Sequence, residues 1–590
     1  MLKRILQFSF LISLFLFVEN SLCAGPVKKQ VEAVRAGNAP VIDGDLSDIA
    51  WKNALSAGQF LQVSPFNGQP SRMKTEVRFV YNDEAIYVGA FLHDSSPDSI
   101  VKYLSKRDDL SLADNFGIYF DPFNDGLIAY GFFVTAAGVQ GDMRSVSGSR
   151  DVEDETWDAV WESAVEINDE GWVVEMKIPY SALRFPKENG KKWGMNIFRN
   201  IRRYREESTW NYVNQEENSV NGQAGMLAGV INIEPPMRLA VNPYAASYIN
   251  KYSNSESAGY SVKGGLDLKY GINESFTLDM MLIPDFGQVE SDDEVLNLSP
   301  FETYYDEKRG FFMEGNELFE RANIFYSRRI GSRPVDFYSA YDNLNENEYV
   351  TENPAETQIL NASKITGKTR KGLSAGFLNA TTNPMYAIIK DSITGEERKL
   401  RTQNLRNYNV SVVEQSLRNN SYVSLINTNL STLNDPYSAN VTGIDLKIAN
   451  KENSHAIFLK SAYSNRRISG SEKENGYYHD LDISRIRGRF LWNYNQRLET
   501  DRYNPNDLGF VRASNEISNG FRLNYNIYQP FWKILRLYNS VFAEYSTLFK
   551  PRVYSDMHVG LRSTTTFVNY FTLGVTAYYK PDANDWYESR

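Results

Sequence analysis

The chain has 590 residues, a formal charge of −10 and a single cysteine. An acidic chain without a stripe of lysine and arginine is poorly suited to a phosphate backbone, so nucleic-acid binding is excluded as an expected function. The four histidines lie far apart and show no zinc-ligand spacing. No apolar run of 18 residues follows the first two dozen positions, which excludes a helical membrane span but not a membrane β-barrel.

The first 24 residues have the pattern of a secretory signal peptide. Lys3 and Arg4 precede an apolar run over residues 5–18, and small residues around Cys23 and Ala24 offer a cleavage site. As a helix, this run would reach about 21 Å, which is short of a hydrocarbon core of roughly 30 Å. We therefore expect export rather than an uncleaved anchor, with the only cysteine removed or inert.

Residues 234–236, Glu-Pro-Pro, divide the rest of the chain into two parts of different composition. Six of the nine tryptophans precede this seam, and 29 of the 37 tyrosines follow it. Two adjacent prolines cannot donate to a β-ladder and they stiffen the chain, as in linkers between domains. We therefore predict a first domain over residues 30–236 and a second domain over residues 237–590.

Short strands separated by turn residues fill the first domain. Apolar residues recur along 77–81, a turn follows at 82–84, and apolar residues resume along 86–91, which predicts a β-hairpin. Five further candidate strands lie at residues 116–120, 129–135, 164–167, 172–178 and 193–199. About ten short strands over roughly 200 residues are typical of an antiparallel β-sandwich.

The alternation in the second domain is sharper and places charged residues on one face. Ile444, Leu446 and Ile448 stand opposite Asp445 and Lys447. The same pattern recurs at residues 266–270, 276–282, 521–527 and 571–579. When such a sheet closes into a membrane barrel, its apolar face meets lipid and no strand edge is left unpaired. We predict an outer-membrane β-barrel of about twelve to fourteen strands, in preference to a soluble all-β domain.

Two parts of the sequence resemble known families. The first likeness is to family 9 carbohydrate-binding modules and rests on residues 39–51 (APVIDGDLSDIAW) and 154–162 (DETWDAVWE). Residues 284–315 are similar to a family, common in Bacteroidetes, that joins such a module to an outer-membrane barrel. The resemblance implies a sugar-binding β-sandwich over about residues 34–233 and a link to carbohydrate breakdown. The polar ending at 585–590 departs from the aromatic last residue of most outer-membrane strands, so the chain is a fragment or its barrel closes differently.

Three tryptophans are the candidates for sugar binding, because sugar recognition needs flat aromatic faces beside polar groups that bond hydroxyls. Trp157 and Trp161 lie four residues apart among acidic residues, and Trp210 follows Glu206 and Glu207 closely. In the family that the first domain resembles, a pair of tryptophans clamps the terminal sugar. The alternative, which we rate as equal, is that these tryptophans pack in the core of the sandwich.

Calcium is the cofactor for which the sequence offers candidates. Asp43, Asp45 and Asp48 lie on a turn-rich segment at the spacing of three oxygens that could hold the ion, and the family's modules carry such ions. We favour the alternative that Asp45 or Ser47 caps the short helix that holds Trp51.

A dense acidic group lies within the second motif. Its members are Glu290, Asp292, Glu302, Asp306, Glu307 and Glu314. Because the segment is too irregular and polar for a lipid-facing strand, we predict a loop folded into the barrel lumen, where Lys308 and Arg309 pair with carboxylates. A plug that maintains the barrel is favoured over catalysis, since no local pattern identifies the pair of carboxylates that a glycosidase needs.

Together these features predict carbohydrate binding at the outer membrane of a Gram-negative bacterium. The module, anchored to lipid by the barrel, would capture a polysaccharide or oligosaccharide for carbohydrate catabolism. One alternative is a hydrolase acting on O-glycosyl bonds, for which no catalytic residue is assigned. A second alternative is a structural module that binds an envelope protein and no small ligand.

Overall fold

The computed structural model describes residues 28–586 with short gaps, and most of this chain is β-strand. The gaps are residues 148–150, 156, 187–189, 191, 218, 235–238, 251–258, 274, 287–288, 290–291, 293, 314, 317, 370, 469–472, 582 and 585. The predicted signal peptide lies outside the described residues. Within them, no helix is long and apolar enough to cross a membrane. The all-β fold class is confirmed.

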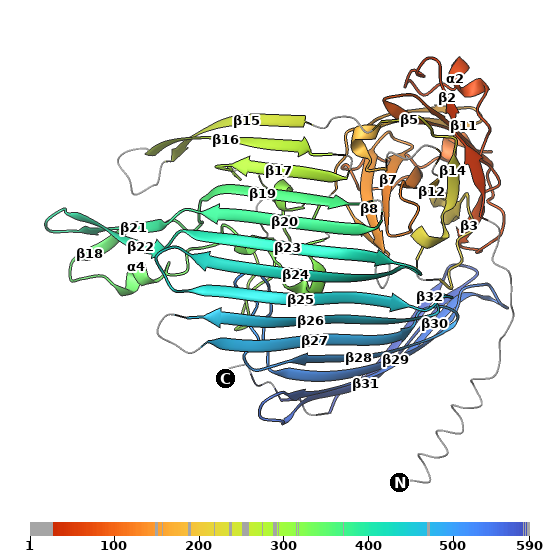
Figure 1. The fold of residues 1–590 in the computed structure, drawn as a ribbon. Helices are drawn as coiled ribbons and strands as arrows, with labels where there is room; N and C mark the ends of the chain where they lie inside the picture. Colours follow the sequence, from red (N-terminus) through yellow and green to blue (C-terminus); the bar gives the residue numbers. More distant parts are fainter. Residues whose placement is uncertain are drawn as a thin grey trace, which may run out of the picture.

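The first domain is a sandwich of a nine-stranded and a five-stranded sheet (Figure 1, red to yellow). In the nine-stranded sheet, the order β1-β14-β12-β6-β7-β8-β9 is extended by β13, which joins β12 to β3. The order in the other sheet is β10-β11-β5-β4-β2. The strands are β1 (Gln30–Glu32), β2 (Val34–Arg35), β3 (Leu61–Ser64), β4 (Thr75–Tyr81), β5 (Ala85–His93), β6 (Asn115–Asp121), β7 (Ile128–Thr135), β8 (Gln140–Ser147), β9 (Asp151–Asp154), β10 (Glu162–Asn168), β11 (Gly171–Pro179), β12 (Trp193–Ile201), β13 (Glu206–Thr209) and β14 (Gly225–Ala228). The short helices are α2 (Ile49–Lys52), η2 (Pro97–Ser99), η3 (Tyr180–Ala182), η4 (Arg202–Tyr204) and η5 (Asn221–Gln223).

The predicted hairpin is formed by β4 and β5, and β6, β7, β10, β11 and β12 match the other five predicted strands. Both sheets turn one apolar face inward, which makes a single shared core.

A buried arginine also lies between the two sheets of the sandwich. The guanidinium of Arg199, on β12, donates to the carbonyls of Lys74 and His93 at 2.9 and 2.8 Å. Burial lowers the pKa of Arg199 to about 10, and these bonds tie one sheet to the other.

The second domain is built on one antiparallel sheet of fifteen strands, called the large sheet (Figure 1). Each strand pairs with the next along the chain, apart from the insertions that follow β17 and β20. Its strands are β15 (Leu239–Asn250), β16 (Gly259–Gly271), β17 (Phe276–Leu282), β19 (Ile359–Lys368), β20 (Leu373–Thr382), β23 (Arg406–Leu417), β24 (Ser421–Thr432), β25 (Ser438–Ala449), β26 (His455–Arg467), β27 (Glu474–Arg485), β28 (Phe490–Glu499), β29 (Glu516–Ile527), β30 (Ile534–Leu548), β31 (Tyr554–Phe567) and β32 (Thr572–Tyr579). A small sheet of β18 (Glu348–Glu352), β21 (Met385–Asp391) and β22 (Glu397–Gln403) projects beyond one end.

On its middle strands the large sheet exposes one apolar face, and its other face buries charged and apolar side chains together. On β25, Ile444 and Ile448 are exposed, whereas Asp445 and Lys447 between them are each only 3% exposed. The same holds on β24, where Leu425 is 53% exposed and Ser424 and Ile426 face inward. This is the alternation of exposed and buried side chains that the sequence predicts.

Residues 284–347, called the plug segment, pack against the inner face of the large sheet. They include α3 (Gly310–Met313), η6 (Arg321–Asn323), η7 (Ser327–Arg329) and α4 (Ser339–Asp342). Phe312, Phe319 and Ile324 share a core with residues of β19 to β27. At Gly443 the contact is close, because a Cβ there would lie 2.9 Å from the side chain of Ala322. The predicted internal plug is therefore confirmed.

The sequence underestimated the number of strands. Eighteen are described after residue 236, fifteen of them in the large sheet, against the expected twelve to fourteen. The other three strands form the small sheet and lie in the insertions after β17 and β20. The alternation of apolar and polar residues does not show that these strands belong to a separate sheet. The predicted seam lies between the last strand of the sandwich, β14, and the first of the large sheet, β15.

Candidate functional site

The three candidate tryptophans lie in the sandwich core. Trp157, Trp161 and Trp210 are 7%, 5% and 3% exposed. The rings of Trp157 and Trp161 contact the ring of Phe132 edge-on, at centroid distances of 5.8 and 5.5 Å. This agrees with the alternative that the tryptophans pack in the core of the sandwich. Little of their ring surface is left for a sugar. Sugar stacking on these rings stays a prediction.

The three candidate calcium ligands bind backbone instead. Asp43 accepts the N–H of Asp45 at 3.0 Å, Asp45 accepts that of Ser47 at 3.1 Å, and Asp48 accepts that of Val41 at 2.8 Å. Among the described residues, no group of three metal-ligating side chains is found. The capping alternative is wrong, because the residue before α2 is Asp48 and its side chain makes no capping bond. Calcium binding stays a prediction without support from this geometry.

A buried carboxylate from a distant strand holds this turn in place. Glu175, on β11, accepts the indole N–H of Trp51 at 2.9 Å and the backbone N–H groups of Gly44 and Asp43 at 2.8 and 3.0 Å. Burial raises the pKa of Glu175, while the three donors act in the opposite direction. The opening motif is therefore anchored to the sandwich by Glu175.

The outer face of the nine-stranded sheet carries a group of aromatic side chains. Tyr119, Phe133 and Phe198 come from β6, β7 and β12 and contact one another at centroid distances of 5.3, 5.4 and 6.4 Å. They fit because glycines face them: a Cβ on Gly117 would lie 2.0 Å from the ring of Phe133. A glycine within a strand thus lets a ring lie against the backbone.

An open cleft of about 580 Å³ lies over this face, and we call it the outer cleft. It is lined by Lys106, Arg107, Asp108, Asp109, Leu110, Ser111, Asn115, Met143, Glu153, Glu155, Asn200 and Arg202. Charged and amide groups therefore surround an apolar base that is formed by the side chains of Leu110 and Met143. Hydroxyl-rich ligands with apolar C–H faces suit such a surface, since both kinds of contact are available.

Two carboxylates lie on the same outer face. Glu153 accepts the hydroxyl of Tyr119 at 2.7 Å, and Glu207 lies directly opposite Asn200 in the pairing of β13 with β12. Burial, with a smaller contribution from the charge of Glu153, raises the pKa of Glu207. A proton held by one of two nearby carboxylates is what acid catalysis of glycoside hydrolysis uses.

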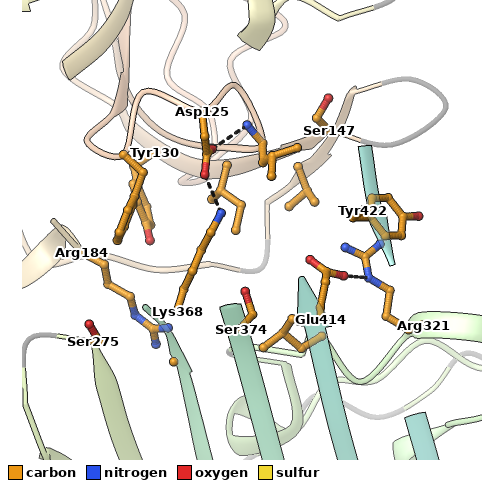
Figure 2. Close-up of a pocket in the computed structure, with 16 residues that line it drawn as sticks. Asp125, Tyr130, Ser147, Arg184, Ser275, Arg321, Lys368, Ser374, Glu414 and Tyr422 are labelled. Carbon is orange, nitrogen blue, oxygen red and sulfur yellow. Dashed lines mark hydrogen bonds and ion pairs between the residues drawn. The ribbon is translucent and has the colours of Figure 1, made fainter. Parts of the chain in front are cut away.

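A second, narrow cavity lies where the sandwich meets the large sheet (Figure 2). Lys368, at the end of β19, reaches Asp125 of the sandwich at 2.6 Å. Arg321 of the plug segment pairs with Glu414 of β23 at 2.6 Å, and the guanidinium of Arg184 is directed toward the cavity. The pair between Lys368 and Asp125 therefore links the two domains beside this cavity, whereas the pair between Arg321 and Glu414 lies within the second domain.

Asp121 lies beside this junction, at the end of β6. It accepts the backbone N–H groups of Asn124 and Gly126, both at 2.8 Å. Burial, and then the negative charge of Asp125, raises the pKa of Asp121 to about 7. Its charge therefore changes within the pH range of ordinary experiments.

The acidic group of the plug segment pairs with cations, as predicted. Asp292 binds Arg328 at 2.6 and 2.8 Å, and Glu302 binds Arg329 with both oxygens at 2.8 Å. Glu307 pairs with Arg309 at 2.7 Å, Lys308 lies 3.9 Å from Asp292, and the carbonyl of Asp306 accepts Arg328. Glu290 and Glu314 lie outside the described residues. These bidentate pairs fix the fold of the segment.

The sequence analysis did not predict the aromatic group or the outer cleft. The available signal was the pair of glycines at 117 and 131 inside strand patterns, because a glycine there marks close approach of another group. The ring that lies against each glycine depends on the register between neighbouring strands. Gly117, for example, lies opposite Phe133 on β7, and this pairing is not visible in the sequence.

Comparison with known proteins matches two families to separate parts of the chain. Residues 42–221 match the family described as Carbohydrate family 9 binding domain-like. Similar solved structures include a family 9 carbohydrate-binding module from Caldicellulosiruptor kristjanssonii in complex with cellotriose (18% identity, 35% of this chain, 100% of that chain, TM-score 0.25). They also include a BenF-like porin from Pseudomonas fluorescens (10% identity, 79% of this chain, 92% of that chain, TM-score 0.26). Among curated proteins none matches. Residues 235–590, more than half of the chain, match Domain of unknown function (DUF5916), and the chain belongs to that family.

Proposed function

We propose that this protein binds carbohydrate at the bacterial outer membrane, with the outer cleft of the sandwich as the sugar site and the large sheet as the membrane anchor. The observation that carries the proposal is that the segment matching a carbohydrate-binding family, residues 42–221, contains this cleft. A polar margin above an apolar base is the chemistry that such a ligand needs.

The surface of the large sheet supports the membrane location. Its exposed side chains include Phe377, Val413, Leu425, Ile444 and Tyr463, from five consecutive strands. A contiguous apolar surface of this kind is unfavourable in water and favourable in a bilayer. The charged groups of the same strands face inward, where they bind the plug segment.

Titration calorimetry of the full chain in detergent micelles tests the sugar site. We expect heat on addition of cello- or xylo-oligosaccharides, and at least tenfold weaker binding when Asn200 and Arg202 are both changed to Ala. Arg78→Ala is the matched control, because β4 belongs to the other sheet. The absence of any heat of binding with a broad panel of glycans would contradict the proposed carbohydrate binding.

Glycoside hydrolysis is the second candidate function, favoured by the proximity of Glu153 and the raised pKa of Glu207. Its signature is release of reducing ends from a polysaccharide by the purified full chain. Glu207→Gln should abolish that release while leaving sugar binding within about twofold. Binding without release would count against catalysis.

A further inference from the structure

We infer that the sandwich lies on the periplasmic side of the outer membrane, so that its cleft meets only glycans that have already crossed that membrane. The inference rests on the proposed membrane location of the large sheet. It concerns which end of that sheet faces the cell, and the two ends differ in structure.

Seven connections at one end of the large sheet are short. They are residues 272–275, 369–372, 418–420, 450–454, 486–489, 528–533 and 568–571, and each has three to six residues. We call this the turn end. The first strand, β15, also starts there, because an antiparallel strand that precedes β16 must begin where β16 ends.

The seven connections at the opposite end vary more in length, and four of them have eight or more residues. They are residues 251–258, 283–358, 383–405, 433–437, 468–473, 500–515 and 549–553. The two longest contain the plug segment and the small sheet of β18, β21 and β22. We call this the loop end. In bacterial outer-membrane barrels, short turns face the periplasm and long loops face the outside.

The sandwich contacts the turn end at four of these turns or beside them. Lys368, next to the first residues of turn 369–372, pairs with Asp125, and Asn420 donates to Ser147 at 3.1 Å. Arg487 and Arg489 pair with Glu217 and Glu216 at 2.9 and 3.0 Å. The ring of Tyr570 lies 5.0 Å from the guanidinium of Arg205.

These contacts involve turns that are widely separated along the sheet, from β19–β20 to β31–β32. Figure 1 shows the result: the sandwich lies at one end of the strands, and β18, β21 and β22 lie beyond the other end. The position of the sandwich is therefore set by polar contacts at several turns and not only by the linker that follows β14.

The orientation restricts the ligand of the outer cleft. A module on the periplasmic side cannot contact an insoluble polymer outside the cell, because the membrane lies between them. The chemistry that remains is a soluble oligosaccharide small enough to have passed the outer membrane. Polymer binding by intact cells is therefore not expected of this protein.

Cysteine labelling in intact cells tests the orientation. The only cysteine, Cys23, lies in the predicted signal peptide, so the unsubstituted chain is the blank. Leu104→Cys places a thiol on the sandwich and Ile393→Cys places one at the tip of the β21–β22 hairpin, at side chains that are 81% and 76% exposed. The probe is a membrane-impermeant polyethylene-glycol maleimide, added to Gram-negative cells that express the full chain.

We expect at least tenfold more label at Ile393→Cys than at Leu104→Cys in intact cells, and equal label after the outer membrane is permeabilised. Label at Leu104→Cys in intact cells, or none at Ile393→Cys, would overturn the inference. Failure of the proposed function itself is distinct: the protein would then be recovered in the soluble fraction, with both positions labelled equally in lysates.

Discussion

Side chains alternate between two faces along the strands of both the sandwich and the large sheet, but only the large sheet leaves a broad apolar face exposed and buries charged groups on the other. In the sandwich, apolar side chains such as Phe79 and Trp172 are buried between two sheets, and charged and amide groups line the outer cleft. In the large sheet, Leu425 and Ile444 are exposed while Asp445 is buried. A strand pattern therefore fixes which residues share a face, and the partner of that face decides whether it is a core or a surface.

The cost of a substitution should differ between the regions for the same reason. Trp172→Ala should lower the free energy of unfolding by about 3–5 kcal/mol, since it removes a large side chain from a packed core. Trp532→Ala, at an exposed turn of the large sheet, should change it by less than about 0.5 kcal/mol. Urea unfolding in micelles, followed by circular dichroism, measures both. Equal effects would contradict the placement of Trp172.

A charge placed on the exposed apolar face gives the next largest effect. Leu425→Arg, near the middle of β24, should destabilise the membrane-inserted protein by about 2–4 kcal/mol, because the guanidinium would lie in hydrocarbon. Leu104→Arg, on the water-facing sandwich, should be neutral within about 0.5 kcal/mol. Reversible folding into lipid vesicles is the measurement. A neutral Leu425→Arg would show that this face of the large sheet meets water.

The junction between the regions should respond to pH through Asp121. Its pKa is raised from 3.8 to about 7, so the folded chain holds a proton that the unfolded chain has released. The stabilising contribution is complete below about pH 4 and is lost as the pH rises through about 7. The melting temperature of Asp121→Asn, minus that of the natural chain, should therefore increase as the pH rises from 5 to 8. Asp98→Asn is the control, and parallel profiles for all three chains would refute the shift.

The ion pair across the junction should have the smallest effect. Lys368 and Asp125 are partly exposed, so their coupling should be about 0.2–1 kcal/mol. A double-mutant cycle with Lys368→Met and Asp125→Asn isolates this coupling. Hydrogen exchange in turn 369–372 should increase in either single variant. A coupling of zero would indicate that the other turns alone hold the sandwich.

The tryptophans and the acidic turn show why site prediction was harder than strand prediction. Trp157 and Trp161 lie between β9 and β10 and pack against Phe132 of β7, so their burial depends on how distant segments come together. The turn at Asp43 depends on Glu175, which is 132 residues away. In contrast, the alternation over 444–448 is visible locally, because residues two apart in a strand share a face.

The all-β class and the residues that share a face of a strand could be predicted from the sequence, since these depend on residues close together in the chain. The acidic plug was also predictable, because its charges exclude it from a lipid-facing strand. The position of the outer cleft and the end of the large sheet that contacts the sandwich could not be predicted from the sequence. Both depend on side chains from strands and turns far apart in sequence, which become neighbours only when the sheets pair and pack.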